Sequence, residues 1–409
     1  MSAGTREPTL ITVLDLIREH PSISRVELAD LTGLTPTTIT HAVRKLMTFG
    51  FVQEAGKLQA VRGGPRRLLE LRPDACYMVG VQFDRWSAVG VIIDLGGQVM
   101  LRHELPAPGT RPPEDVVADF AAHVETMLQT AGVNRSDVLG IGLATYGPQD
   151  REGGTLLTPQ PTEAWQGFSL TKTLADATGL PVVLENDATA AALGVQSLGG
   201  SSGSFAVVFM ATGIGAEVVV DGQPYRGAAS NGLELGHISL NIHGPVCTCG
   251  NRGCLDSYAG PRAVAENAER DPELARRLDL GHGPLADFLT VAEATLSGDT
   301  GAEALINDSA GMLAAGIVTL VNLLDVNRVV LAGSAFATIG PFYRTVIQEV
   351  LENSVFMRHV HGVRTELAND TSHAAAIGGA IVVLRNMLEA SAMRESRAPG
   401  GTASPAATR

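Results

Sequence analysis

The chain repeats one pattern of strands in its two halves. Apolar residues alternate through two pairs of segments, and a glycine turn closes each pair: 77–83 with 88–94, then 205–210 with 217–220. The letters correspond too, with VGVIIDLGGQV near residue 89 and GAEVVVDGQPY near residue 215. The sequence pattern also predicts a strand at 329–331 and helices at 112–131, 186–197, 311–324 and 341–352. Since alternating strands and helices build layered sheets, the repeat predicts an α/β protein with two similar lobes.

Two lobes on this plan are typical of the actin-like, sugar-kinase-like fold, in which the lobes close over a cleft. We expect a first lobe over residues 77–198, a second over 199–371, and a last helix over 372–388 that packs back onto the first lobe. The tail 394–409 is rich in Pro, Gly, Ala and Ser. Such a composition cannot bury a core, so we expect this tail to be disordered.

Residues 1–72 follow a different pattern, that of a small helical module. After a first amphipathic helix, Ser24 can cap a second helix that Gly33 stops, and Thr35 can cap a third. Two short helices joined by a glycine-containing turn have the spacing of a helix-turn-helix. A predicted β-hairpin over 53–71 adds a wing. The module is therefore predicted to be a winged helix-turn-helix DNA-binding domain.

The third helix and the wing carry the residues expected to touch DNA. Hydroxyls and an imidazole can reach base edges or phosphates in the major groove, while Lys and Arg suit phosphates. The expected contacts are Thr35, Thr37, Thr38, Thr40, His41, Arg44, Lys45, Arg62, Arg66 and Arg67. The alternative is a three-helix scaffold whose basic residues only solvate its surface. The agreement of turn, cap and basic wing favours DNA binding.

Charge divides unevenly along the chain. The net charge is −13, yet residues 1–72 carry +3 and the remainder −16. A uniformly basic nucleic-acid coat is thereby excluded, and binding at one end is favoured. The opening MSAGTREPTL has no apolar core of a signal peptide, and the longest apolar stretch, around 310–324, is too short for a membrane span. We expect a cytoplasmic protein without membrane contact.

Three of the four cysteines lie within positions 247–254. Together with His237, residues Cys247, Cys249 and Cys254 offer one imidazole and three thiolates, with glycines between them for tight turns. This is a ligand set of structural zinc, which prefers closed tetrahedral sites, so we predict a structural Zn²⁺. A redox Cys-x-Cys pair or fortuitous free thiols are the alternatives, and the fourth ligand favours the metal.

Polar residues in two further segments are candidates for a ligand site. Asn186 and Asp187 end a predicted strand, a common place for binding groups in open α/β sheets. Glu234 and His237 lie three residues apart, so they share one face of a helix. Carboxylates and amides can hydrogen-bond adjacent sugar hydroxyls. Taken singly, Glu234 is an ordinary helix N-terminal carboxylate and Asp187 an ordinary cap.

The segment YRGAASNGLELGHISLNIHGPVCTCGNRGCLD resembles the signature of the ROK family, which groups sugar-responsive repressors, uncharacterised reading frames and sugar kinases. The winged helix resembles that of its repressor branch. The resemblance implies zinc at the His and three Cys named above. It also implies sugar contacts from Asn186, Asp187, Glu234, His237 and Asp256. At Asp256 the family usually has Glu, which is one methylene longer.

The same resemblance bears on catalysis, because kinases of this fold need Asp-x-Gly-Gly-Thr between the first two strands to hold phosphates. Here the stretch reads GVQFDRW, with Gln82 for the Asp, Asp84-Arg85 for the glycines and Trp86 for the Thr. A second loop, ATGIG from residue 211, is partly kept, and a later glycine run is reduced to AGS. We therefore expect no enzyme activity. Asp187, which matches the kinases' general base, is expected to bind sugar instead.

These features together predict a sugar-responsive transcriptional regulator, in the simplest case a repressor. A homodimer or homotetramer would bind double-stranded operator DNA, and a sugar or sugar phosphate would bind between the lobes. Lobe closure would then change the spacing of the DNA-binding heads. The alternative is an ATP-dependent hexose or N-acetylhexosamine kinase with an appended DNA-binding head. The sequence leaves open which sugar binds, and whether it releases or promotes DNA binding.

Overall fold

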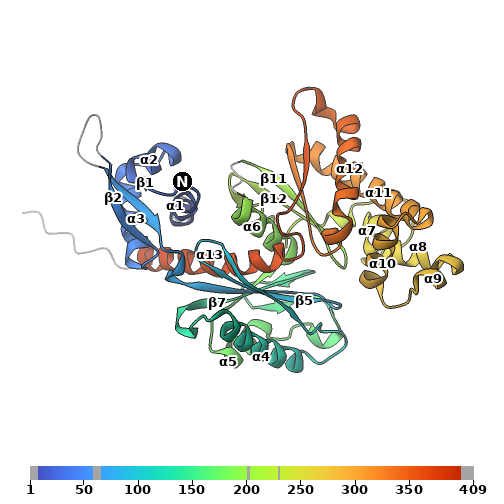
Figure 1. Ribbon diagram of the computed structural model, residues 1–409, viewed down its shortest axis with the longest axis horizontal. Helices are drawn as coiled ribbons and strands as arrows, with labels where there is room; N and C mark the ends of the chain where they lie inside the picture. Colours follow the sequence, from blue (N-terminus) through green and yellow to red (C-terminus); the bar gives the residue numbers. More distant parts are fainter. Residues whose placement is uncertain (1–7, 59–65, 200–202, 229–230, 398–409) are drawn as a thin grey trace, which may run out of the picture. The chain divides into compact units, whose positions relative to one another are not determined.

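The computed structural model describes residues 8–58, 66–199, 203–228 and 231–397 (Figure 1). These residues divide into two compact units, one drawn from 8–76 and 383–397 and the other from 77–382. Of the tail expected over 394–409, everything from residue 398 onward lies outside the described residues.

Residues 8–76 of the first unit form three α-helices and a β-hairpin, and residues 383–397 belong to a long last helix. The elements are α1 (Pro8–Glu19), β1 (Ile23–Ser24), α2 (Arg25–Thr32), α3 (Pro36–Thr48), β2 (Val52–Leu58) and β3 (Arg66–Leu71), with the strands in the order β1-β3-β2. Ser24 and Glu27 form a capping box at the start of α2, and Gly33 ends that helix with φ +66°. At the start of α3, Thr35 Oγ1 accepts the Thr38 N–H at 3.2 Å. The helix-turn-helix and its wing are thus confirmed, because each local capping signal forms as predicted.

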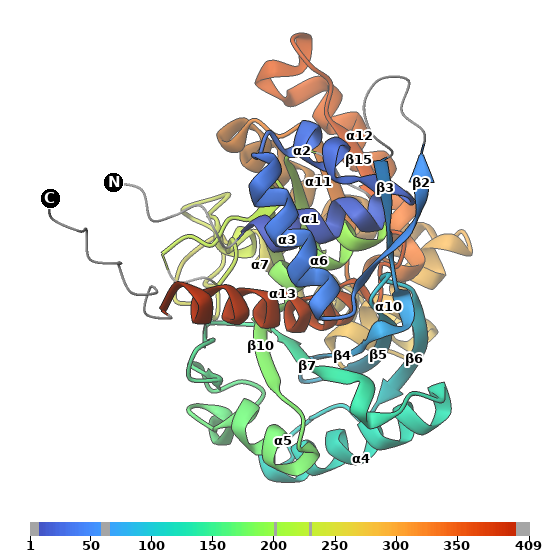
Figure 2. The same ribbon diagram turned by 90° about the vertical axis from the view of Figure 1, so that its left-hand side faces the viewer.

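The first lobe of the second unit contains a five-stranded sheet in the order β10-β7-β4-β5-β6. Its strands are β4 (Tyr77–Phe83), β5 (Ala88–Asp94), β6 (Val99–Leu105), β7 (Val138–Thr145) and β10 (Val182–Asn186). Helices α4 (Pro113–Ala131) and α5 (Leu170–Thr178) cover one face (Figure 2), where Phe83, Phe120 and Trp165 are fully buried. Strands β4, β7 and β10 run parallel, so Thr145 and Asn186 pair at the carboxyl ends of β7 and β10.

The second lobe repeats this plan, with the sheet order β13-β12-β11-β14-β15. Its strands are β11 (Phe205–Met210), β12 (Ile214–Val220), β13 (Gln223–Pro224), β14 (Arg328–Ala332) and β15 (Arg364–Leu367). Its helices are α7 (Asp256–Ala259), α8 (Pro261–Glu269), α9 (Pro272–Leu278), α10 (Pro284–Leu296), α11 (Thr300–Leu324) and α12 (Phe336–Ser354). Helices α11 and α12 lie side by side, and α7–α10 gather beyond α11 (Figure 1). The duplication predicted from the sequence is therefore present in the two sheets.

Helices α6 (Asp187–Gly199) and α13 (Ala374–Arg397) contribute small side chains to the junction of the two lobes. A Cβ on Gly142 in β7 would lie 1.8 Å from the Gly379 carbonyl oxygen, and one on Gly378 would lie 1.6 Å from the Ala190 carbonyl oxygen. Only glycine permits such close approach of backbones. Alanines of both helices complete the contact with β11 and β14.

Three helices are longer than expected. Helix α11 begins at Thr300 rather than 311, and α13 extends to Arg397 rather than 388. Helix α12 begins at Phe336 and includes Pro341, which the sequence pattern had suggested as its first residue. Pro341 lacks an N–H to donate to the previous turn, but burial of Phe336 and Ile339 in the second-lobe core stabilises the added turn.

Two helices are long and apolar enough to cross a membrane: Thr300–Leu324 and Ala374–Ala392. Half of the most apolar window of the first and about two thirds of that of the second are buried inside the protein. Core helices of water-soluble folds have the same property, so length and composition alone are weak evidence for a membrane span.

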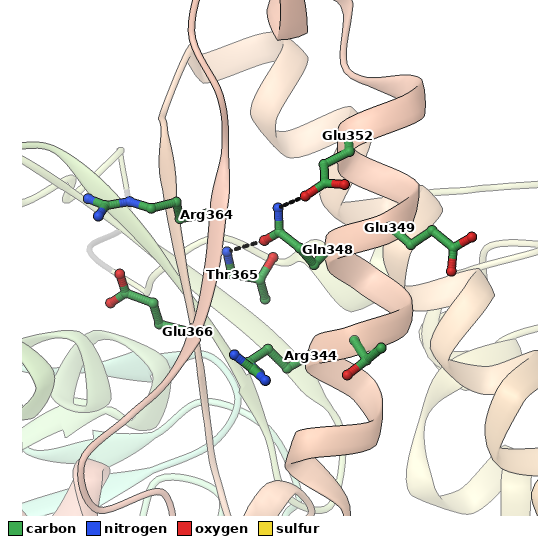
Figure 3. Close-up of a pocket in the computed structure, with 8 residues that line it drawn as sticks. Arg344, Gln348, Glu349, Glu352, Arg364, Thr365 and Glu366 are labelled. Carbon is green, nitrogen blue, oxygen red and sulfur yellow. Dashed lines mark hydrogen bonds between the residues drawn. The ribbon is translucent and has the colours of Figure 1, made fainter.

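A side-chain amide covers the free edge of the second sheet (Figure 3). From α12, Gln348 Nε2 donates to the Val363 carbonyl at 3.0 Å, and Gln348 Oε1 accepts the Thr365 N–H at 2.8 Å. A neighbouring strand would make the same pair of bonds. Gln348 therefore protects edge strand β15 from pairing with another chain.

Candidate functional site

Asn186 and Asp187 stand where β10 passes into α6. The Asn186 side-chain oxygen accepts the N–H groups of Ala188 and Thr189, at 3.0 and 3.2 Å, and so caps the helix. This arrangement leaves the Asn186 Nδ2 as the group that can donate to a ligand. Asp187 Oδ1 accepts the Ala188 N–H at 2.8 Å. Both residues are thus fixed by the local geometry of a strand-to-helix turn.

Glu234 directly precedes a single 3₁₀ turn, Leu235–His237, and His237 is its last residue; the segment is not an α-helix. Residues three apart eclipse in a 3₁₀ turn, so the prediction that they share a face holds for a different reason. Asp256 begins α7, and its Oδ1 accepts the Ile214 N–H at 3.1 Å. This carboxylate therefore anchors the loop between β11 and β12.

The five predicted residues Asn186, Asp187, Glu234, His237 and Asp256 form what we call the acidic cluster. Burial, reinforced by the nearby charges of Asp84 and Glu234, raises the pKa of Asp187 to about 7. Burial likewise raises the pKa of Glu234 and of Asp256, and His237 opposes both shifts. The charged members of the cluster thus act on one another: Glu234 on Asp187, and His237 on both Glu234 and Asp256.

The turn between β4 and β5 is closed by one of its own carboxylates. Asp84 is buried, and its Oδ1 accepts the N–H of Trp86 at 2.6 Å and of Ser87 at 2.8 Å. The Arg85 guanidinium lies over the Trp86 ring, 4.9 Å from its centroid. The two amides of this turn are therefore already paired with a negative charge of the chain itself.

Tyr146 interacts with Asp84 and Asp187, and it was not predicted from the sequence as a site residue. Burial raises the pKa of its phenol well above the usual range and so favours the neutral form, and the charges of Asp84 and Asp187 act in the same direction. Tyr146 follows β7, next to the strand that ends in Asn186. The rule that ligand groups gather at the carboxyl ends of parallel strands could have located it.

His237 also belongs to a second group, with three cysteines. Its Nδ1 lies 3.7 Å from Cys247 Sγ, and Cys249 Sγ lies 3.7 Å from Cys254 Sγ. All four donor atoms fall within 4.8 Å of one another. Ligands at about 2.3 Å in a tetrahedron stand about 3.8 Å apart, so these four groups could hold one metal ion.

Two thiols of this group shift in opposite directions: burial and the neighbouring thiols raise the pKa of Cys254 to about 12, whereas the pKa of Cys247 is lowered. Burial raises the pKa of the Cys247 thiol, but hydrogen bonds from the Cys249 backbone N–H, from the side chains of Cys249 and Cys254 and from His237 outweigh burial and lower the pKa to about 6. A thiolate is the form of cysteine that binds metals.

Three of the predicted DNA contacts of the first unit lie on one exposed face of α3. Thr37, His41 and Arg44 are exposed at helical spacing, opposite buried residues such as Val43. Other predicted residues of this segment have contacts within the protein: Thr35 and Thr38 share a hydrogen bond of 2.9 Å, and Thr40 Oγ1 donates to the Pro36 carbonyl. Lys45 is partly buried.

The predicted arginines of the wing differ in their surroundings. Arg67 on β3 is exposed but forms an ion pair with Glu54 of β2, which also accepts from Arg25 at 3.0 Å. Arg66 lies at the start of β3, and Arg62 lies outside the described residues. Arg67 therefore has a partner within the protein that the sequence reading did not anticipate.

Sequence comparisons relate most of the chain to bacterial proteins. It is 26% identical over 391 residues to a putative xylose repressor of Caldicellulosiruptor sp., covering 92% of this chain and 96% of that protein. It is 31% identical over 293 residues to the N-acetylmannosamine kinase of Escherichia coli O157:H7, covering 71% of this chain and 92% of that enzyme. Both a repressor and a kinase are thus among its relatives.

Solved structures agree on the fold. A ROK family transcriptional regulator, homologous to the E. coli MLC protein, superposes with a TM-score of 0.74 at 23% identity and covers 95% of this chain and 98% of its own. The ROK hexokinase of Thermus thermophilus superposes with a TM-score of 0.61 at 28% identity, over 76% of this chain and 99% of its own. Residues 6–53 match the winged helix-turn-helix DNA-binding profile. Because residues 78–386 match the ROK family profile, this chain belongs to the ROK family.

Proposed function

We propose that the protein is a sugar-responsive transcriptional repressor of the cytoplasm. Its winged helix binds operator DNA, and its acidic cluster senses a sugar. Support comes from the exposed polar face of α3 and from similarity to repressors along 92% of the chain. The named relatives make a pentose such as D-xylose the first effector to test.

The observation that carries this proposal over a kinase is the closed turn between β4 and β5. Phosphoryl transfer depends on free amides and a metal that hold the donor's phosphates. Here Asp84 occupies the amides of Trp86 and Ser87. A triphosphate at this turn would meet a buried carboxylate where it needs donors, and like charges repel.

The second phosphate loop supports the same conclusion. Asp256 occupies the Ile214 N–H in the loop between β11 and β12. The chain's own carboxylates thus satisfy amides on both lobes. Asp187 keeps a position suited to a general base, but without a held phosphoryl donor it acts as a sugar ligand.

The proposed contacts to the sugar follow from the donor and acceptor atoms that remain on each side chain. Asn186 donates through Nδ2, while Asp187 and Glu234 accept from hydroxyls. His237 uses Nδ1 toward the thiolates and Nε2 toward the sugar. Asp256 is committed to Ile214 and serves chiefly to hold the loop.

The metal of the cysteine group is proposed to be zinc, held by His237, Cys247, Cys249 and Cys254. Three thiolates and one imidazole leave no open coordination position, so zinc there supplies structural rigidity rather than Lewis-acid chemistry. It would stiffen the segment that carries Glu234 and His237. Gly253, whose added Cβ would lie 1.8 Å from the Asn241 carbonyl oxygen, lets the loop fold tightly.

DNA recognition is proposed for the face of α3 made by Thr37, His41 and Arg44, together with Arg66 of the wing. Such heads usually act in symmetric pairs, because two half-sites lie one helical turn apart. We therefore propose a homodimer, or a pair of dimers, in which sugar binding changes the spacing of the heads.

A gel-shift experiment on the chain's own upstream DNA tests this function. Binding is measured with and without D-xylose, D-glucose, N-acetylglucosamine and N-acetylmannosamine, each also as its phosphate. We expect a specific complex that one of these compounds weakens. Absence of a specific complex under every condition would refute the proposal.

The kinase is the second candidate, because Asp187 is present and a kinase is 31% identical to the chain. An ADP-release assay over the same sugars tests it, accompanied by calorimetry with magnesium and a non-hydrolysable ATP analogue. We expect neither turnover nor nucleotide binding. Turnover with any of the sugars would establish the enzyme instead.

A further inference from the structure

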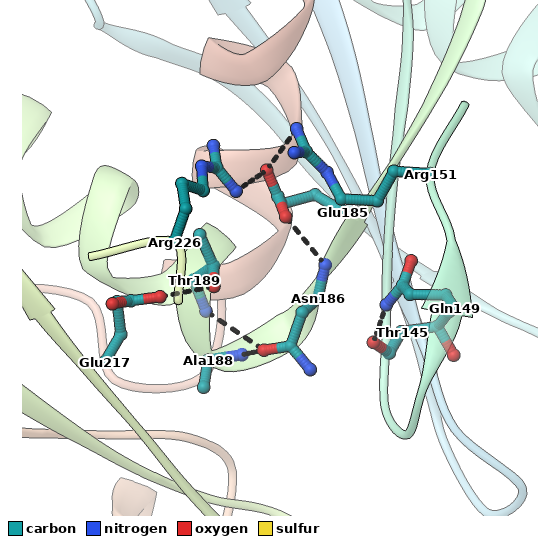
Figure 4. Close-up of polar contacts among 9 residues, drawn as sticks. All are labelled: Thr145, Gln149, Arg151, Glu185, Asn186, Ala188, Thr189, Glu217 and Arg226. Atoms are coloured by element: carbon teal, nitrogen blue, oxygen red, sulfur yellow. Dashed lines mark hydrogen bonds and ion pairs between the residues drawn. The ribbon is translucent and has the colours of Figure 1, made fainter. Parts of the chain in front are cut away.

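Glu185 is a fully buried carboxylate that directly precedes Asn186, a member of the acidic cluster (Figure 4). Its Oε2 lies 2.9 Å from Arg151 Nη2 and 2.7 Å from Arg226 Nη1, and its Oε1 accepts the Asn186 N–H at 3.1 Å. One carboxylate thus contacts two arginines and the backbone N–H of Asn186, a residue predicted to bind the sugar.

The two arginines come from different lobes. Arg151 follows β8 (Gln149–Asp150) in the first lobe, close in sequence to the strands around β7, whereas Arg226 follows β13 in the second. The pair Glu185–Arg226 therefore crosses the junction, and the pair with Arg151 does not. A second link lies nearby, because the Gln149 N–H donates to Asn231 Oδ1 at 2.9 Å.

Glu234, in the other half of the acidic cluster, follows Arg226 by eight positions, and residues 229 and 230 between them lie outside the described residues. Leu233 pairs with Ala216 of β12 through two backbone hydrogen bonds, of 2.9 and 3.0 Å, and Glu234 follows. Gly232, with φ +75°, lies so close to Asn186 that an added Cβ would be 3.0 Å from its Oδ1. The two halves of the cluster meet here.

We propose that Arg226 is a positioning residue, which through Glu185 holds the segment bearing Glu234 and His237 in register with Asn186 and Asp187. The inference rests on the proposed sugar site. Its physical basis is that a buried carboxylate strongly favours charged partners. Without Arg226, Glu185 keeps its pair with Arg151 of the same lobe but loses its ion pair with the other lobe. Because Glu185 also accepts the Asn186 N–H, we expect loss of Arg226 to loosen the backbone at Asn186 as well.

Hydrogen exchange of the unliganded full chain tests the inference without any sugar. Arg226→Met removes the charge and keeps the apolar stem, so we expect amides in 185–192 and in 231–240 to exchange about tenfold faster, equivalent to about 1.4 kcal/mol of local opening. Arg226→Lys should restore slow exchange. Glu185→Gln should reproduce the effect, and adding it to Arg226→Met should change little more.

Arg328→Ala is the matched control, because it breaks an ion pair with Glu366 that lies wholly within the second lobe. It should leave both segments unchanged. The inference is wrong if Arg226→Met leaves both segments at the wild-type rate, or if Arg328→Ala accelerates them equally.

Calorimetry then links the residue to binding. The probe is whichever of D-xylose, D-glucose, N-acetylglucosamine and N-acetylmannosamine binds the wild-type chain. Arg226→Met should weaken its binding about tenfold, with recovery in Arg226→Lys and no change in Arg328→Ala. Unaltered affinity in Arg226→Met would overturn the positioning role. If no sugar binds the wild type, the proposed function fails, while the exchange experiment still decides the inference.

Discussion

Glu217 is a completely buried carboxyl group in the middle of β12. It accepts the Thr189 hydroxyl through Oε2 and the Val218 N–H through Oε1, which ties α6 to the second sheet (Figure 4). Burial raises its pKa to about 7, while these hydrogen bonds and Arg226 oppose the shift and Glu185 adds to it. At the scale of single residues, the lobe junction thus contains a carboxyl group that keeps its proton to a higher pH than an ordinary glutamate.

Stability should therefore depend on pH through Glu217. Between the unfolded pKa of 4.5 and the folded pKa of about 7, the folded protein keeps a proton that the unfolded chain has lost. The free energy of unfolding contributed by this group is present below pH 4.5 and falls as the pH rises to about 7. Glu217→Gln, which resembles the protonated form, should be more stable than the wild type above pH 7 by about 2 kcal/mol and nearly equal to it at pH 4.5.

Urea unfolding of both proteins from pH 4.5 to 8.5 measures this difference. Glu349→Gln, a change of the same kind on the exposed side of α12, is the control and should follow the wild type throughout. A constant difference between Glu217→Gln and the wild type across this range would contradict the prediction.

At the scale of elements, α3 combines a buried and an exposed face in thirteen residues. The buried face carries Ile39, Ala42, Val43 and Leu46, and the exposed one carries Arg44. A helix packed in this way presents its polar side chains without changing its own stability. Substitutions on the exposed face should therefore affect DNA binding alone.

Arg44→Ala should weaken operator binding and lower the slope of log affinity against log salt by about 1, since one phosphate contact is lost. Fluorescence anisotropy at several salt concentrations measures the slope, and sugar binding should stay unchanged. Arg277→Ala removes the same charge from the second lobe, where the side chain pairs with Asp299, and should keep the wild-type slope. Equal slopes for all three proteins would count against the contact.

The close packing of helix α13 gives a second prediction at this scale. A Cβ at Gly378 would lie 1.6 Å from the Ala190 carbonyl oxygen, a backbone atom that cannot rotate away. Gly378→Ala should therefore destabilise the protein by about 2 kcal/mol or more. Gly311→Ala, in the helix α11 where a Cβ meets nothing within 4 Å, should instead stabilise it by about 0.5–1 kcal/mol. Thermal unfolding of the two variants distinguishes these opposite signs.

At the scale of the whole molecule, the proposed zinc site and the acidic cluster share His237. Removing the metal should free the loop that carries Glu234 and His237, so that sugar no longer stabilises the fold. A chelator, or Cys249→Ser, should abolish the rise in Tm caused by the bound sugar, and adding zinc back should restore it only in the wild type. Zinc content by atomic emission and thermal shifts with the sugar measure both effects. A full shift in metal-free protein would mean that the loop does not support the site.

Local chemistry was sufficient to predict much of this protein. Capping by Ser24 and Thr35, the turn at Gly33 and the repeated strand pattern act over a few residues, so they could be read directly. The residue types of the proposed zinc site could be predicted in the same way, because His nitrogen and Cys sulfur are the atoms that bind zinc. Helix ends were predicted less well, since burial of Phe336 extends α12 past a proline.

Tertiary structure alone decided how these groups are used. That Asp84 closes its own turn, that Arg67 is paired with Glu54, and that Glu185 joins arginines of two lobes depend on residues brought close only by folding. The order of residues specifies which groups can bind, because their chemistry is intrinsic. Whether a group is available, buried or already partnered depends on packing between distant segments, and only the folded chain determines that.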